Sequence, residues 1–189
     1  MNKQLWIEKA LGLGIQEFEI YQSTTVEKEM TWFQGQMDTL VSSKVTGTSI
    51  RGIVDGKMAN MALEEIDDSM CETVLKSLIE QAYIISNEET DSLRKPESID
   101  YVKKDVTWNM ASTEYVKDIL QSLEAKILAY DPRVIQVGYL GYSQGSGSRS
   151  IVNSLGMDVQ DADEMQYIVA SVVVKEEEEV KDASLVEVV

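Results

Sequence analysis

The sequence predicts an α+β fold, in which an antiparallel meander sheet is covered by amphipathic helices and followed by a further helix and long β-strands. Three observations support this class. Residues 25–63 alternate between apolar and polar side chains, and glycines interrupt the alternation at turn positions. Residues 70–85 and 112–130 repeat apolar side chains every three or four positions, as amphipathic helices do. Beyond residue 133, β-branched and apolar runs predict strands.

The composition is that of a folded protein, and its length suits one good-sized domain or two small ones. The chain has 189 residues, of which 43% are hydrophobic and 26% charged. No apolar run approaches the ~20 residues that a membrane-spanning helix needs, and the first residues lack the apolar core of a signal peptide. One cysteine allows no internal disulfide, which fits a reducing compartment. We therefore expect a cytoplasmic protein.

The charge and the missing histidines exclude several functions. The formal net charge is −16, and so acidic a surface repels phosphate groups, which makes nucleic acid and membranes unexpected partners. The sequence contains no histidine, so it cannot form a histidine triad or an imidazole zinc site, and a single cysteine excludes a Cys-rich one. We therefore expect no catalytic, cofactor-binding or metal-binding residue in this chain.

The N-terminal third predicts a helix, a strand and the meander. Residues 2–13 form the helix, which Gly12 or Gly14 would end, and residues 17–21 alternate as a strand. The meander turns at residues 34–36 and again at the Asp55-Gly56 pair, a strong hairpin signal. The expected apolar stripe of the helix is Leu5, Trp6, Ala10, Leu11 and Leu13. Trp32 and Phe33 end one arm of the meander, and we expect them to pack at the sheet edge rather than to form a binding platform.

The middle of the chain predicts two amphipathic helices separated by a polar connection at residues 86–107. Asp67 and Asp68 precede the first helix, where negative charge is favourable. Its expected apolar stripe is Met70, Cys71, Val74, Leu75, Leu78, Ile79, Ala82 and Tyr83. Cys71 on this stripe is expected to be a buried, unreactive thiol with a high pKa, because no base is available to activate it. The second helix is expected to bury Val116, Ile119, Leu120, Leu123, Ile127 and Leu128, and Asp131-Pro132 would end it.

The last third predicts strands and turns. Residues 134–140 read as a strand, and the glycine- and serine-rich residues 141–150 as a bulged or flexible hairpin rather than a phosphate-binding loop, since the Lys-Ser/Thr ending is missing. A turn is expected at residues 154–156, and a charged turn at 176–179. Residues 165–174 are apolar on both faces, which predicts a strand buried on both sides. Because residues 185–189 form a further apolar β-run whose edge would need a partner, we expect the natural chain to continue beyond it.

Four short stretches, in this order, resemble the TldD/PmbA family. They are Phe18-Glu19-Ile20-Tyr21, Gln34-Gly35-Gln36, the run from Gly47 to Lys57, and Asn153-Ser154-Leu155-Gly156. This family is also called the modulators of DNA gyrase and is grouped with the metallopeptidases. Met58-Ala59-Asn60 departs from the Gly-Phe-Ala-like step usual in the family, and the Asn-Ser-x-Gly stretch is closer to its PmbA side.

The resemblance implies that residues 1–189 are the N-terminal domain of a longer protein, with a possible subdivision near residues 87–107 and a β-rich C-terminal domain that is absent here. It implies an assembly with a second copy or a paralogous subunit that handles unfolded peptides in an internal chamber, in proteolysis or peptide maturation. In TldD-like members a His-Glu-x-x-x-His helix of the C-terminal half holds zinc. Zinc would therefore lie only in that missing part, and no catalytic residue carries over to this chain.

Two alternatives come from other functional classes. A stand-alone peptide-binding or protein-interaction module would capture extended peptides by strand addition at an exposed sheet edge. An enzyme complete in this chain would have to use the carboxylates Glu64, Glu65, Asp67 and Asp68. Carboxylates so close together ahead of a helix more often cap it and interact with its dipole.

Overall fold

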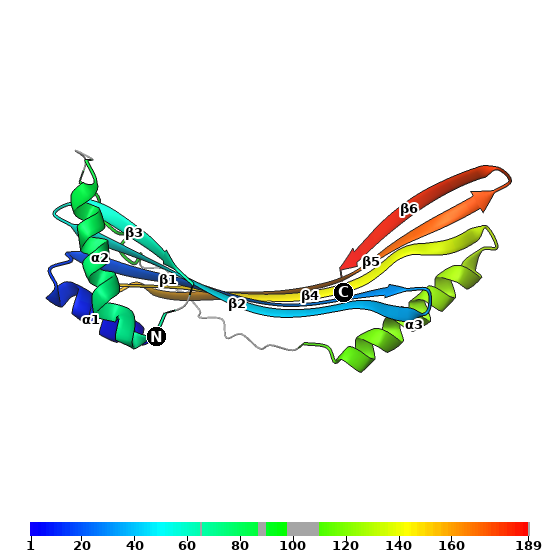
Figure 1. Cartoon of the computed structure of the whole chain (residues 1–189), viewed down its shortest axis with the longest axis horizontal. Coiled ribbons are helices and arrows are strands. Elements are labelled where there is room, and N and C mark those ends of the chain that lie inside the picture. Colours follow the sequence, from blue (N-terminus) through cyan, green and yellow to red (C-terminus); the bar gives the residue numbers. More distant parts are fainter. Residues whose placement is uncertain (65, 87–89, 98–109, 189) are drawn as a thin grey trace. The chain divides into compact units, whose positions relative to one another are not determined.

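The computed structural model of the chain describes residues 1–64, 66–86, 90–97 and 110–188. It confirms the α+β class, with a six-stranded antiparallel sheet in the order β3-β2-β1-β4-β5-β6 and three α-helices (Figure 1). The elements are α1 (Lys3–Gly12), β1 (Glu17–Phe33), β2 (Gln36–Val54), β3 (Lys57–Leu63), a 3-10 turn (Asp68–Met70), α2 (Cys71–Ile84), α3 (Thr113–Tyr130), β4 (Val134–Asn153), β5 (Asp158–Glu176) and β6 (Glu179–Val188).

The chain divides into two compact units. Unit 1 comprises Met1–Thr24, Val45–Val106 and Ser148–Ala162, and unit 2 comprises Thr25–Lys44, Thr107–Gly147 and Asp163–Val189. Strands β1, β2, β4 and β5 each contribute residues to both units. The predicted subdivision near residues 87–107 stays a prediction, because residues 87–89 and 98–109 lie outside the described part of the chain.

Unit 1 buries its core beneath α1 and α2, as the amphipathic patterns predict (Figure 1). Trp6 and Leu75 from the helices and Phe18 and Ile20 from β1 are all fully buried. Gly52 on β2 permits this close packing, because a Cβ at that position would lie 2.8 Å from Leu78 Cδ2. The absence of a side chain at this strand position therefore lets α2 approach the sheet closely.

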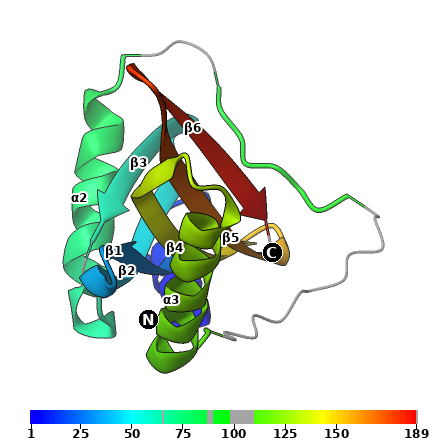
Figure 2. The same ribbon diagram turned by 90° about the vertical axis from the view of Figure 1, so that its right-hand side faces the viewer.

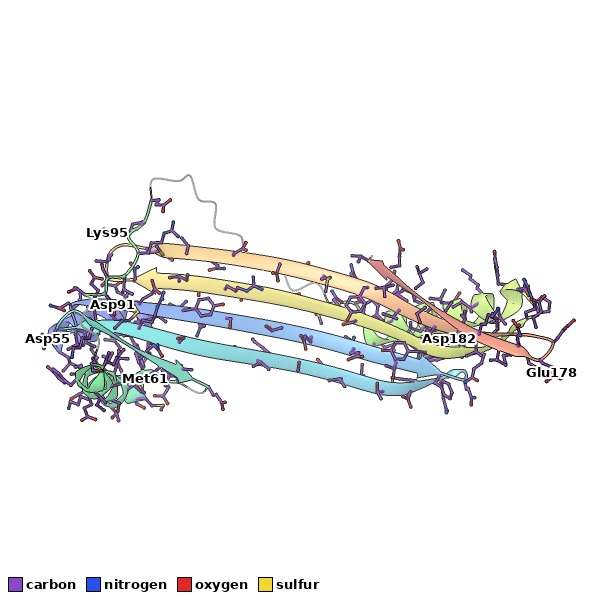
Figure 3. All side chains as sticks on the ribbon, turned by 90° about the horizontal axis from the view of Figure 1, so that it is seen from above. Asp55, Met61, Asp91, Lys95, Glu178 and Asp182 are labelled. Atoms are coloured by element: carbon purple, nitrogen blue, oxygen red, sulfur yellow. The ribbon has the colours of Figure 1, made fainter. Side chains whose placement is uncertain are left out.

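Among the described residues, the turns β1–β2, β2–β3 and β5–β6 each contain a non-glycine residue with positive φ. Gln34 and Gly35 have φ of 49° and 79°, and Asp55 and Gly56 have 50° and 76°, as two-residue type I′ turns require. Both predicted hairpins are confirmed. The charged turn at residues 176–179 is also confirmed: Glu177 (φ 56°) and Glu178 join β5 to β6, with Glu176 opposite Glu179, and Figure 3 marks both this turn and Asp55.

Three strand predictions are corrected. Residues 141–150 are not a hairpin, because β4 runs unbroken from Val134 to Asn153 through the glycines and serines. Its pairing between β1 and β5 outweighs the weak strand preference of those residues. Likewise β1 is continuous from Glu17 to Phe33, where the sequence predicted a separate strand at residues 17–21 ahead of the meander. Residues 165–174 are not buried on both sides: Met165 is exposed and the others are only partly covered.

The helix boundaries follow their caps, whereas the predicted stripes are too wide. The side chains of Asn2 and Ser112 accept hydrogen bonds from the Leu5 and Tyr115 amides and so begin α1 and α3. The exposed members of the predicted stripes are Leu11 and Leu13 in α1, Met70 and Tyr83 in α2, and Leu128 in α3. Ile7 is buried although it was not predicted. These errors lie at helix ends and flanks, where the sheet no longer covers the helix.

Unit 2 has a separate core beneath α3. Met30 and Trp32 of β1 pack with Val116 and Leu120 of α3 and with Leu140 of β4. The predicted packing role of Trp32 is thus confirmed, but β1 lies in the middle of the sheet, so its placement at a sheet edge was wrong. Within the described residues, no helix is both long and apolar enough to cross a membrane.

Candidate functional site

The predicted carboxylates serve the local structure around the start of α2. The Asp67 carboxylate accepts hydrogen bonds from the amide (2.7 Å) and hydroxyl of Ser69, and these lower its pKa. Asp68 Oδ1 accepts from the Asn2 amide (2.8 Å) and Trp6 Nε1 (3.0 Å), which lowers its pKa as well. Glu64 is exposed, and Glu65 lies outside the described residues. The two aspartates therefore act as a cap and as a tie between α1 and α2.

Cys71 is a buried core residue, as predicted. Its side chain is fully covered within the unit 1 core, and burial raises the pKa of the thiol. A thiol in this state packs as a small apolar group. In the described part of the chain, no group of three or more acidic or cysteine side chains is arranged to hold a metal ion.

A buried carboxylate that the sequence did not reveal connects three segments of unit 1. Glu19, only 2% exposed, accepts hydrogen bonds from the Arg51 guanidinium and, at 3.2 Å, from Asn153 Nδ2. Asn153 also donates to the Arg94 carbonyl at 2.9 Å, and its Oδ1 accepts from the Leu155 amide at 3.0 Å. The network joins β1, β2 and the turn after β4, so its effect is structural.

Glu124 is the corresponding buried carboxylate of unit 2. It is 8% exposed, and its Oε2 accepts from Trp32 Nε1 at 2.7 Å and from the Gly35 amide at 2.9 Å. It therefore ties the turn between β1 and β2 to α3. Glu124 falls on the apolar side of α3 between Leu120 and Ile127, and this interruption of the stripe is the one sequence signal that could have revealed it.

One face of the sheet in unit 2 is turned away from α3. Met30 and Trp32 point toward the helix, so Glu29, which directly precedes Met30, points the other way. Ile168 and Ala170 pack against the α3 core, which places Tyr167 and Val169 on the opposite side. Two further contacts complete this set. The Tyr139 hydroxyl donates to Glu29 at 3.5 Å, and the β5–β6 register places Val188 opposite Tyr167 and Val186 opposite Val169.

We call Glu29, Tyr139, Tyr167, Val169, Val186 and Val188 the open face. It combines two phenol hydroxyls, a carboxylate and three valines on four strands. Partial burial, together with the charge of Glu29, raises the pKa of Tyr139, so its hydroxyl stays protonated and can donate a hydrogen bond. These groups can hold a polypeptide by hydrogen bonds and apolar contacts. They offer no nucleophile paired with a base.

A hollow of about 360 Å³ lies on the other side of unit 2, near the end of α3. Tyr130, Val172, Val174 and Lys181 contribute to its lining. Arg133 and Asp131 also line the hollow. The Arg133 guanidinium is paired, because it donates to both carboxylate oxygens of Asp131 at 3.0 Å. This contact lowers the pKa of Asp131 to about 2. The hollow therefore combines apolar surface with the side chains of Lys175 and Lys181, while the Arg133 guanidinium is held by Asp131.

Two family models match this sequence. The model for PmbA/TldA metallopeptidase domain 1 matches residues 18–86, and the model for the PmbA/TldA metallopeptidase central domain matches residues 107–185. The chain belongs to the PmbA/TldD family. The resemblance inferred from the four short stretches is thereby confirmed.

Solved structures share the PmbA/TldD fold of this chain. A candidate modulator of a DNA gyrase from Thermotoga maritima matches with a TM-score of 0.77 at 18% identity, covering 98% of this chain and 42% of the other. TldE from Thermococcus kodakarensis matches with 0.78 at 18%, covering 97% and 42%. A candidate DNA gyrase modulator from Bacteroides thetaiotaomicron matches with 0.73 at 19%, covering 99% and 44%. The chain thus spans less than half the length of these proteins. No curated protein matches it by sequence.

Three of the four stretches that carry the PmbA/TldD resemblance contribute to the buried network of unit 1. Glu19, Arg51 and Asn153 come from three of the four stretches, and all three side chains belong to that network. The fourth, around Gly35, forms the type I′ turn. These stretches therefore specify turns and packing in this family member, and a chemical role for them is not needed to explain their residues.

Proposed function

We propose that this chain is the non-catalytic N-terminal part of a PmbA/TldD-like peptidase or peptidase partner. In this proposal it forms part of the wall of a peptide-handling chamber and a contact with a second subunit, in cytoplasmic proteolysis or peptide maturation. Family membership supports it, as does a sequence without histidine that spans less than half of its solved relatives. Any zinc of the assembly would be held by polypeptide outside these residues.

The open face is the observation that carries the peptide-handling role. Unfolded peptides present polar and apolar side chains, and the open face offers an acceptor and a donor at Glu29 and Tyr139 beside the exposed side chains of Val186 and Val188. Aromatic side chains add large contact areas at a low entropy cost. The formal net charge of −16 favours peptides that carry lysine or arginine.

Peptide titration tests this role. A fluorescein-labelled unfolded peptide with basic and apolar residues should bind the 189-residue chain, and Tyr167→Ser should weaken the binding about tenfold by removing an aromatic contact. Tyr83→Ser is the matched control, because Tyr83 is an exposed tyrosine on α2 that is not part of the open face. Fluorescence anisotropy that shows no binding at millimolar peptide, or equal affinities for the two variants, would refute the role.

A stand-alone module that captures peptides by strand addition is the second candidate. Its support is β6, which ends the sheet and is exposed throughout. Strand addition depends on the peptide backbone, whereas the open face contacts side chains. A peptide N-methylated at alternate residues should therefore keep its affinity for the open face. Loss of binding on N-methylation would favour the stand-alone module.

A further inference from the structure

We propose that β6 joins two copies of this chain into one continuous antiparallel sheet, in a register centred on Ser184. The inference rests on the proposed function, because it assigns residues to the subunit contact named there. We call the paired β6 strands the seam. The occupant of the free edge is a second copy of this chain, and the reason lies in the order of side chains along β6.

The outer edge of β6 has no strand partner among the described residues. β6 is the last strand of the sheet, and all ten of its residues pair with β5 on the inner side (Figures 1 and 2). Its apolar side chains are exposed: Val180 by 58%, Leu185 by 67%, Val186 by 56% and Val188 by 67%. It contains no proline and its register shows no bulge, which are two usual protections of such edges. A regular, apolar, unpaired edge can accept another strand.

Two-fold symmetry allows only some registers. In a symmetric antiparallel pair, residues that lie opposite each other must project from the same face of the sheet. Two residues that lie opposite each other must therefore both have even numbers or both have odd numbers. In the register centred on Ser184, Lys181 lies opposite Glu187, and Val180 lies opposite Val188. Symmetry produces each of these pairs twice, so these positions match in charge and in apolar character, whereas Asp182 lies opposite Val186. Lys181 also contacts Glu179 of its own strand at 2.9 Å.

The two neighbouring registers lack this match. Centring on Ala183 would place Glu179 opposite Glu187, which sets like charges against each other. Centring on Leu185 would place Glu187 opposite Ala183 and leave Lys181 without an acidic residue opposite in β6. In the antiparallel seam the two acidic hairpin turns, marked by Glu178 in Figure 3, lie at opposite ends, which limits the repulsion between two acidic chains.

A charge-swap series tests the seam. Sedimentation velocity at 150 mM salt should show reversible dimers of the 189-residue chain. Lys181→Glu and Glu187→Lys should each raise the dimer Kd about tenfold, because each sets like charges opposite each other twice. The double variant restores opposite charges and should return to within about threefold of the wild-type value. Lys117→Glu on α3 and Glu80→Lys on α2 are exposed controls with the same charge changes and should leave the Kd unchanged.

A disulfide at the axis provides a second measurement. Ser184 would lie opposite its own copy, where Cα atoms of an antiparallel pair are about 4.5 to 5.5 Å apart, within the range that a disulfide spans. Ser184→Cys should therefore crosslink two chains under mild oxidation with oxidised glutathione. Asp182→Cys is the control, because the two copies of residue 182 would be about 13 Å apart. Cys71 is buried and should not contribute.

The outcomes separate this inference from the proposed function. Dimers with the same Kd in the wild type and the charge-swap variants, or dimers that do not crosslink in Ser184→Cys, would overturn the seam. The subunit contact would then involve another surface. A chain that stays monomeric but still binds peptide at the open face would overturn the seam and retain peptide handling. Binding of unrelated extended peptides at β6 in place of self-association would also overturn it.

Discussion

Removing the buried Glu124 carboxylate should destabilise unit 2 far more than removing an exposed carboxylate from the same helix. In Glu124→Ala, Trp32 Nε1 and the Gly35 amide lose their shared acceptor. In Glu124→Gln, the side-chain oxygen can still accept both hydrogen bonds, and only the negative charge is lost. The two variants therefore separate the hydrogen bonds from the charge.

The magnitude follows from the burial of the two donors. Trp32 is 2% exposed, so its unpaired N–H pays a desolvation penalty of about 2 kcal/mol. Gly35 is exposed, so its amide can recover a water partner and loses about 1 kcal/mol. Glu124→Ala should thus cost about 3 kcal/mol in the free energy of unfolding. Glu124→Gln should cost about 1 kcal/mol, because a charge-assisted hydrogen bond is roughly twice as strong as a neutral one.

Urea unfolding at pH 7, with hydrogen exchange at the Gly35 amide as a local probe, measures both effects. Exchange at Gly35 should accelerate strongly in Glu124→Ala and only slightly in Glu124→Gln. Glu114→Gln is the matched control, since Glu114 is exposed near the start of the same helix. Equal destabilisation by alanine and glutamine, or a cost below about 1 kcal/mol for alanine, would refute the assigned role of the carboxylate.

Three further outcomes are expected. Gly52→Ala should cost about 1 to 3 kcal/mol in urea unfolding, because its Cβ would lie 2.8 Å from an α2 side chain, whereas Gly12→Ala has open space and should stabilise α1; equal effects would contradict the packing. The pKa of Asp131 is about 2 and should return toward 3.8 in Arg133→Gln, which an NMR titration of the two proteins would measure. Since the folded pKa lies below the unfolded one, this contact stabilises above pH 4 and is lost between about pH 4 and 2. Cys71 should resist thiol reagents until urea unfolds unit 1, and fast labelling of the native chain would show that it is not buried.

Local signals in the sequence were sufficient for the turns at residues 34–36 and 55–56 and for the end of α3. Asp55-Gly56 predicts its hairpin because both residues tolerate positive φ, a preference that depends on no distant partner. The end of α3 at Asp131-Pro132 is likewise local, because proline disfavours helical geometry in the residue before it. The order of four short stretches also identified the family, because turn residues keep their spacing whatever packs around them.

Only the tertiary structure decided which polar groups are buried and which apolar ones remain exposed. Glu124 lies 92 positions from Trp32, and Glu19 lies 134 positions from Asn153, so neither partner can be inferred from neighbouring residues. The same holds for the glycine- and serine-rich part of β4, which is extended because strands on both sides pair with it. Residues 165–174 are rich in apolar side chains, and they remain partly exposed because α3 covers one face of their sheet and no described helix covers the other. Backbone preference is a property of adjacent residues, whereas burial depends on what the rest of the chain brings alongside.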